Sequence, residues 1–308
     1  MSDFDLLAAD SIAQLRANTL SCNIEGIQAT LSELRLSLDD ETFQAKTIPF
    51  LHDAVEKNEV RLVDCFLKNN VSINSQLVVK ATTNTAYQIL EVFLNYGWNI
   101  NTPINLYSPS ALACSFHDSD LTKWFLAHGA NPNQRSDVNT DCTPLSIAFM
   151  EASFEIIQAL LKHGASLQHG QVLHYAAMRK LDDRLEVLKY LLDRNHSPNA
   201  IMYQNCGNDY YFHMYSGIGT PLHHAVANGL LDSVKLLVQY GALPRMRDPM
   251  GQTPTDWAKR NGHEHIFDFL YPLSIGSDPE DIQFTDTPGR HFRPKPLDES
   301  IMKNVRLL

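Results

Sequence analysis

The sequence has no closely spaced pair of cysteines. Its cysteines number five, and no CxxC pair occurs among them. Structural zinc ribbons and dithiol redox motifs need such pairs, so the spacing argues against both. Scattered thiols are typical of proteins kept in a reducing, intracellular compartment. The positions are Cys22, Cys65, Cys114, Cys142 and Cys206.

Positive charge and long apolar runs are also scarce. The chain has 25 Lys and Arg against 35 Asp and Glu, a formal net charge of −10. Phosphate backbones repel an acidic chain, which disfavours direct nucleic-acid binding. No apolar run approaches the ~18 residues of a membrane helix, and Met1–Asp5 lacks the features of a secretory signal. We therefore expect an intracellular monomer in the cytoplasm, the nucleus or both, without membrane binding.

Catalytic signatures are missing as well. The chain contains no G-x-S-x-G, no G-x-x-x-x-G-K-[ST] and no G-x-G-x-x-G, which mark nucleophile elbows, phosphate loops and dinucleotide folds. His263 and His265 are two residues apart, so on a helix they point to different sides. The i, i+4 histidine pair of a zincin is absent. We expect no enzyme, no cofactor and no metal site.

What the sequence does contain is a motif that returns about every 33 residues. In its best copy, Thr220-Pro221 opens a helix, because proline suits a first turn in which its missing N–H is not needed. Apolar residues within Leu222–Val226 form one helix face, and Asn228-Gly229 ends that helix. A second helix around Leu236–Val238 stops at Gly241, which supplies a positive φ. Such a period is typical of a solenoid of stacked helix pairs.

This copy resembles the ankyrin repeat, whose helix pair opens with T-P-L-H-x-A. Seven copies follow one another over residues 47–271, some close to the pattern and some degenerate. The resemblance implies an all-α ankyrin-repeat solenoid of stacked antiparallel helix pairs with β-turn fingers. The first helices of the seven copies fall at Leu51–Ala54, Ala81, Ser110–Leu112, Thr143–Ala148, Leu173–Ala176, Thr220–Ala225 and Thr253–Ala258.

Two segments flank the array. Residues 1–46 form a helical N-terminal cap, in which residues 12–36 have the spacing of a divergent repeat. From Pro272 onward the pattern stops, and we interpret residues 272–308 as a flexible tail.

A histidine recurs at one position of the repeat in three copies. These residues are His52, His174 and His223. Metal ligands must converge on one point, whereas these residues belong to different repeats. The resemblance implies instead that each bonds to neighbouring backbone and helps to join adjacent repeats. His224 is an extra histidine beside this position, and we expect it to face solvent or a binding surface.

The connection before Thr220 is about a dozen residues longer than usual, and the extra residues lie within residues 200–218. Insertions in repeat arrays map to the loops of one face, often the binding face. Large aromatic and Met side chains offer contact area at protein interfaces. The alternative is that these rings fold back and cover exposed core. The candidate partner-binding residues are Tyr203, Tyr210, Tyr211, Phe212, Met214, Tyr215 and His224.

These features favour a non-enzymatic module that binds another protein. The resemblance implies roles such as regulatory adaptor, inhibitor or transcription coregulator, the last through a DNA-binding partner. One alternative is a substrate-recruiting subunit of a ubiquitin ligase, whose additional helical box only residues 272–308 could hold. The other is an enzyme accessory with a site near residues 200–218, which would need a pocket of converging polar groups.

Overall fold

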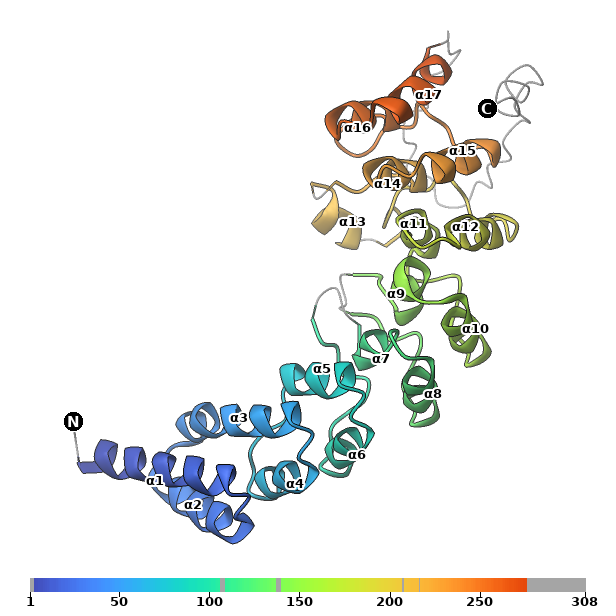
Figure 1. Cartoon of the computed structure of the whole chain (residues 1–308). Coiled ribbons are helices and arrows are strands. Elements are labelled where there is room, and N and C mark those ends of the chain that lie inside the picture. The colour runs from blue at the N-terminus through green and yellow to red at the C-terminus, as the bar shows by residue number, and fades with distance from the viewer. Residues whose placement is uncertain (1–2, 106–108, 137–139, 207, 216, 276–308) are drawn as a thin grey trace. The chain divides into compact units, whose positions relative to one another are not determined.

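The protein is a series of helix pairs (Figure 1). The computed structural model describes residues 3–105, 109–136, 140–206, 208–215 and 217–275. Within these ranges no strand forms beyond single-residue bridges at positions 105 and 140, which confirms the predicted all-α class. No helix in the same ranges combines the length and apolar character needed to cross a membrane.

The chain divides into two compact units. Unit 1 comprises Met1–Ile104 and Ser110–Ala130, and unit 2 comprises Asn105–Pro109 and Asn131–Leu308. The helices of unit 1 are α1 (Asp3–Leu20), α2 (Ile24–Ser37), α3 (Asp40–Glu56), α4 (Val60–Lys68), α5 (Ser75–Thr83), α6 (Tyr87–Asn95), α7 (Ala111–Cys114) and α8 (Ser119–Ala127).

Unit 2 continues the same alternation, with one extra short helix, α13. Its helices are α9 (Pro144–Glu151), α10 (Phe154–Lys162), α11 (Val172–Ala177), α12 (Arg184–Leu192), α13 (Asn208–His213), α14 (Pro221–Ala227), α15 (Leu231–Gln239), α16 (Pro254–Arg260) and α17 (Glu264–Ser274).

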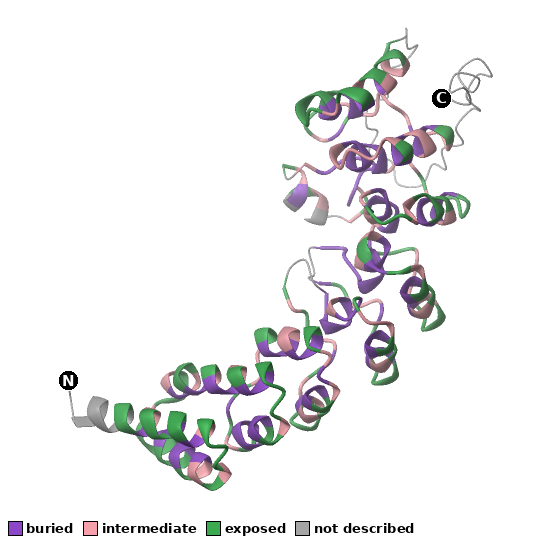
Figure 2. Ribbon diagram, viewed as in Figure 1, coloured by how far each residue is buried: buried purple, intermediate pink, exposed green. Residues whose placement is uncertain are grey.

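Within each unit, the first helix of a pair packs on the second helix of that pair and on the first helices of the neighbouring pairs. The first helices α1, α3, α5 and α7 stack in unit 1, and α9, α11, α14 and α16 stack in unit 2. Buried residues concentrate on the faces between these helices (Figure 2). Helices of about nine residues are marginal in isolation, so this packing between neighbours holds them in place.

Most of the second helices end at a residue whose backbone has the left-handed conformation, with a positive φ. Gly241 has a φ of 87°, as the sequence predicted. In two pairs asparagine replaces glycine, and Asn70 and Asn195 both have a φ of 63°. Asparagine tolerates this region better than other side chains do, so the helix ends as it does at a glycine.

Asparagine side chains also link consecutive pairs. Asn133 Nδ2 donates to the Gly164 carbonyl over 2.8 Å, and Asn199 Nδ2 donates to the Gly241 carbonyl over 2.9 Å. Asn101 makes the same kind of bond to Gly129. Each of these asparagines lies four residues after the residue that closes the preceding helix. Sequence reasoning missed this link, although its spacing was visible.

In the degenerate repeat at the start of the array, the link to the next pair comes from a helix and not from a connecting loop. Gln44, on α3, donates to the Asn70 carbonyl over 2.9 Å and accepts from the Ser72 amide over 2.8 Å. A glutamine on a first helix therefore replaces the asparagine of a connecting loop.

Two predicted boundaries differ from the structure. The boundary between residues 46 and 47 falls inside α3, because Asp39 caps that helix by accepting from the Thr42 amide over 2.8 Å. At the other end, α17 passes through Pro272 to Ser274, since a proline in the last turn removes only one bond of the helix. The tail was predicted to be flexible. From residue 276 onward it lies outside the residues that the structure describes.

A buried arginine joins the pair α9–α10 to the pair α11–α12. Arg179 has no exposed surface and forms a two-pronged ion pair with Asp183 at 2.6 and 2.7 Å. The same guanidinium donates to the Ala152 carbonyl over 2.7 Å and to the carbonyls of Ala148 and Phe149. It thereby satisfies the carboxyl end of α9 and joins that pair to the next.

We expect Arg179→Met to lower the free energy of unfolding of unit 2 by about 3 kcal/mol, because it leaves Asp183 and several carbonyls without their donor. The control is Lys189→Met, which breaks the exposed Lys189–Asp193 ion pair of 2.8 Å and should change stability by less than about 0.5 kcal/mol. Urea unfolding followed by circular dichroism measures both. Equal effects of the two substitutions would contradict a structural role for Arg179.

Candidate functional site

The candidate site is the segment of residues 200–218, referred to below as the insertion, which lies between α12 and α14 and contains α13. Its two ends are held together, because the Met202 amide donates to the Gly219 carbonyl over 3.0 Å. The Ile201 amide donates to Gln204 Oε1 over 2.8 Å and forms a tight first turn. The insertion therefore leaves and rejoins the array at one place.

One half of the insertion is a small hydrophobic core. Its fully buried members pack together with half-buried aromatic and thiol side chains, including Tyr175 of α11. This half packs on α11 through Tyr175. The buried members are Ile201, Met202, Tyr203 and Ile218, and the half-buried ones are Tyr175, Cys206 and Tyr210.

Tyr203 holds the turn in place despite an unfavourable backbone. Its φ of 63° lies in the left-handed region, which tyrosine rarely adopts. Its amide donates to Gln171 Oε1 over 3.1 Å, and its ring stacks on His213 with centroids 4.8 Å apart. Only 5% of the residue is exposed. Packing and hydrogen bonding thus compensate the backbone strain.

A polar network joins the insertion to the preceding repeat. Asp141 Oδ2 accepts from the Gly170 amide over 3.0 Å and from Gln171 Nε2 over 2.9 Å, and it lies 3.8 Å from Cys206 Sγ. The Arg135 side chain lies 3.7 Å from the other carboxylate oxygen. These groups converge on one another, so the network positions the loop.

The other half of the insertion faces solvent. Tyr211 is 71% exposed and Tyr215 is 76% exposed, while Met214 is half-buried. The rings of Tyr210 and Tyr211 meet edge to face, with centroids 5.7 Å apart. This contact connects the exposed rings to the buried half. Phe212 lies in α13, and its side chain is outside those the structure describes.

The neighbouring connections touch the insertion on both sides. Thr140, before α9, lies 3.4 Å from His213 Nε2. Gly217 lies next to the ring of Trp257 on α16. The insertion therefore packs against the repeats before and after it.

His224 does not face solvent, so the first of the two predicted placements is wrong. It is 8% exposed and lies edge to face with His174, at 5.8 Å between centroids, and with Trp257, at 6.1 Å. The reason is the stacking of α11, α14 and α16, which places the second histidine of the pair between first helices. Its role in partner binding stays a prediction.

The predicted structural role is confirmed for two of the three repeat histidines. His174 Nε2 bonds the Ala200 carbonyl over 2.9 Å, and His223 Nε2 bonds the Gln252 carbonyl over 3.1 Å. His52 makes no such bond within the described part of the chain. In that same part no group of three or more His, Cys, Asp or Glu side chains could hold a metal ion.

Burial keeps these histidines neutral. Desolvation, opposed in part by the backbone bonds, lowers the pKa of His174 to about 4 and that of His223 to about 4. Desolvation, with smaller contributions from the two other histidines, lowers the pKa of His224 well below its usual value. All three favour the folded state only while they remain uncharged.

Comparison with known proteins agrees with this architecture. The family described as "Ankyrin repeats (3 copies)" matches residues 110–202 and 203–282, more than half of the chain. The chain belongs to the ankyrin repeat family. The match is to a family of interaction modules, since ankyrin arrays present extended binding surfaces to other proteins.

Individual relatives match different shares of the chain. "Putative ankyrin repeat protein L371" of Acanthamoeba polyphaga mimivirus is 26% identical over 72% of this chain, which spans 29% of that protein. Human "Protein phosphatase 1 regulatory subunit 27" is 46% identical over 18% of the chain and 36% of its own length. "Putative E3 ubiquitin-protein ligase XBAT34" of Arabidopsis thaliana is 35% identical over 28% of the chain and 20% of its own length.

We expect the stability of the array to fall in mild acid. Unfolded histidine titrates near 6.5, whereas folded His174 and His223 titrate at about 4, so between these values the unfolded chain binds more protons. The free energy of unfolding is therefore at its full value above about pH 6.5. Between that pH and pH 4 it falls by about 1.4 kcal/mol per pH unit for each buried histidine. Urea unfolding across this range measures the slope.

His224→Leu should reduce that slope by the share of one histidine. His265→Leu, at an exposed histidine, is the matched control and should leave the slope unchanged. If neither substitution changed the slope, the pH dependence could not be assigned to the buried histidines.

The two halves of the insertion should respond differently to truncation. We expect Tyr203→Ala to lower the free energy of unfolding by about 3 kcal/mol, because it empties the core of the insertion. Tyr215→Ala removes an exposed ring and should change stability by less than about 0.5 kcal/mol. Thermal unfolding of both variants measures the difference, and similar losses would show that the insertion is not divided in this way.

Proposed function

We propose that this protein is a non-enzymatic regulatory adaptor and that its partner protein docks on the exposed half of the insertion. The observation that carries the proposal is the exposure of two aromatic residues of the insertion, Tyr211 at 71% and Tyr215 at 76%. Tyrosine is enriched among the residues that dominate binding energy at interfaces.

Preorganisation supports this role. A loop that orders only on binding loses conformational entropy at that moment, which weakens the complex. Here the buried core of Tyr203 and its neighbours orders the insertion beforehand. The exposed rings therefore stand on a folded base, and a partner can bury them at little entropic cost.

An enzymatic role has less support. The polar side chains that converge beside the insertion are Asp141, Gln171 and Cys206, and they bond to one another and to backbone. We infer that their task is to position the loop. No cofactor is part of the proposal.

For the regulated process we propose transcription, through a DNA-binding partner. The net charge of −10 disfavours direct contact with a phosphate backbone, so a second protein has to provide the DNA contact. Such a partner places the adaptor in the nucleus for part of its cycle.

Substrate recruitment to a ubiquitin ligase is the second candidate, favoured by the ligase among the relatives. In that case the exposed rings would bind the substrate and another part of the chain would bind the ligase. The two candidates differ in the class of the captured partner, which is a DNA-binding protein in the first and a ligase subunit in the second.

Affinity capture from the native cell should separate these candidates. We expect the double variant Tyr211→Ala, Tyr215→Ala to lose its partner, with affinity reduced at least about tenfold, because exposed aromatic anchors dominate such interfaces. Tyr271→Ala is the control, since Tyr271 is 49% exposed and lies on α17. A partner set unchanged in the folded double variant would contradict docking at the insertion.

A further inference from the structure

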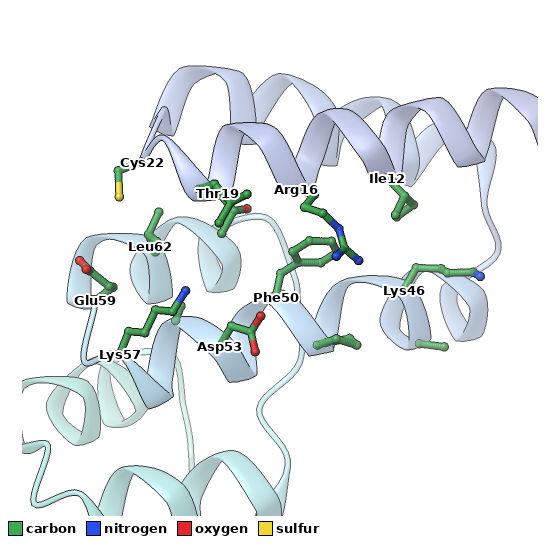
Figure 3. A pocket seen from close by; sticks show the side chains of 14 residues that line it. Ile12, Arg16, Thr19, Cys22, Lys46, Phe50, Asp53, Lys57, Glu59 and Leu62 are labelled. Atoms are coloured by element: carbon green, nitrogen blue, oxygen red, sulfur yellow. The ribbon is translucent and has the colours of Figure 1, made fainter.

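Unit 1 contains a groove that the proposed function does not use. It lies between α1 and α3, has a volume of about 400 Å³, and is closed at one end by the start of α4 (Figure 3). α1 contributes a row of residues at positions 12, 16 and 19, which share one helix face. α3 and its C-cap residue contribute a parallel row that runs from residue 45 to residue 57.

The floor of the groove is apolar. Phe50 and Leu62 lie at its base, and Ile12 closes it from α1. Leu20 and Pro49 stand on the rim, where Leu20 is 74% exposed. A large exposed leucine beside an apolar floor is a surface that gains free energy when a partner covers it.

Charged side chains surround this floor. Arg16 of α1 lies over the Phe50 ring, with Cζ 6.0 Å from the centroid, and Lys46 of α3 stands near the same end (Figure 3). Asp53 lies further along α3, Lys57 directly follows that helix, and Glu59 lies at the far end. One end of the groove is therefore cationic, and the other end carries both signs of charge.

These charges have no partners. Within the described residues, none of the five side chains makes a hydrogen bond or an ion pair, although Arg16 has its contact with Phe50. Other charges on the same helices are paired, as Glu56 is with Lys80 over 2.8 Å. The groove thus combines an apolar floor with cations that are available to an incoming carboxylate.

We propose that this groove binds an amphipathic helix of a partner protein, which places apolar side chains on Leu20 and Pro49 and acidic side chains beside Arg16 and Lys46. The charge pattern favours acidic side chains at the end with Ile12 and Lys46, because the charged residues that line that end are the cations Arg16 and Lys46. This site is in unit 1 and does not depend on the insertion of unit 2.

The length of the groove fits a helix. From residue 45 to residue 57 a helix rises by about 18 Å, and from residue 12 to residue 20 by about 12 Å. Two to three turns of a third helix match this length, with apolar anchors at i, i+3 or i+4, and i+7. Such a helix would rest on two parallel neighbours in the way that helices pack within the array.

The test uses a labelled amphipathic peptide of about 16 residues, with leucines at i, i+3, i+4 and i+7 and glutamates along one edge. Fluorescence anisotropy measures its binding to the full chain. We expect Arg16→Glu and Lys46→Glu each to weaken binding about tenfold, because each replaces an attraction by a repulsion. A peptide with lysine in place of glutamate should recover affinity for these variants.

Matched substitutions outside the groove control for general effects. Lys68→Glu, on the exposed face of α4, makes the same charge change as Lys46→Glu and should leave binding unaltered. Leu20→Ser should weaken binding, whereas Leu36→Ser, at a leucine of α2 that is 91% exposed, should not. Circular dichroism verifies that every variant is folded.

Three results would overturn the proposal. The first is that the acidic peptide fails to bind the wild-type chain. The second is that Lys68→Glu weakens binding as much as Lys46→Glu, which would mean that the peptide is attracted by the overall charge and not by the groove. Light scattering could instead show that the wild-type chain dimerises and that Leu20→Ser abolishes the dimer, which would make a second copy the occupant. Affinity capture with the Tyr211→Ala, Tyr215→Ala variant tests the exposed half of the insertion, and its outcome is independent of these results.

Discussion

The constraint on which this structure depends is that no helix pair can bury its apolar face alone. Most helices span about nine residues, too few to be stable in isolation. Within each unit, each pair is therefore held by its contacts with the helices of the neighbouring pairs. Any repeat that departs from the common pattern must still present a matching surface to both sides. The irregular parts of the chain are best understood as different ways of meeting that requirement.

Two departures show how it is met. Where the connection before α11 is short, Arg179 bonds the carboxyl end of α9, and Ser146 Oγ donates to the Gly170 carbonyl. Gly170 has a φ of 80°, and a side chain there would collide with Ser146, so the close approach requires glycine. At the start of the array Gln44 makes the link that Asn133 and its equivalents make elsewhere. Contacts between repeats are thus retained where the sequence motif is lost.

The parts of the fold that follow from local pattern could be predicted from the sequence, and the parts that follow from three-dimensional packing could not. Thr220-Pro221 and Gly241 mark where helices begin and end, because capping and left-handed residues act within one turn. The start of α3 was missed because the polar turn at Asp39 precedes the apolar pattern. His224 was misplaced because its burial depends on α11 and α16, which are far from it in sequence. The groove of unit 1 arises from the spacing of α1 and α3, which no linear motif encodes.

The two proposed surfaces rely on different physical interactions, and ionic strength distinguishes them. The exposed half of the insertion offers aromatic area, whose burial depends little on salt. The groove offers Arg16 and Lys46 around an apolar floor, and attraction between exposed charges is screened over about 10 Å at moderate salt. A partner that docks on Tyr211 and Tyr215 would stay bound as salt rises, whereas a helix in the groove would be released. One chain could then hold one partner firmly and exchange another, which is the behaviour that an adaptor requires.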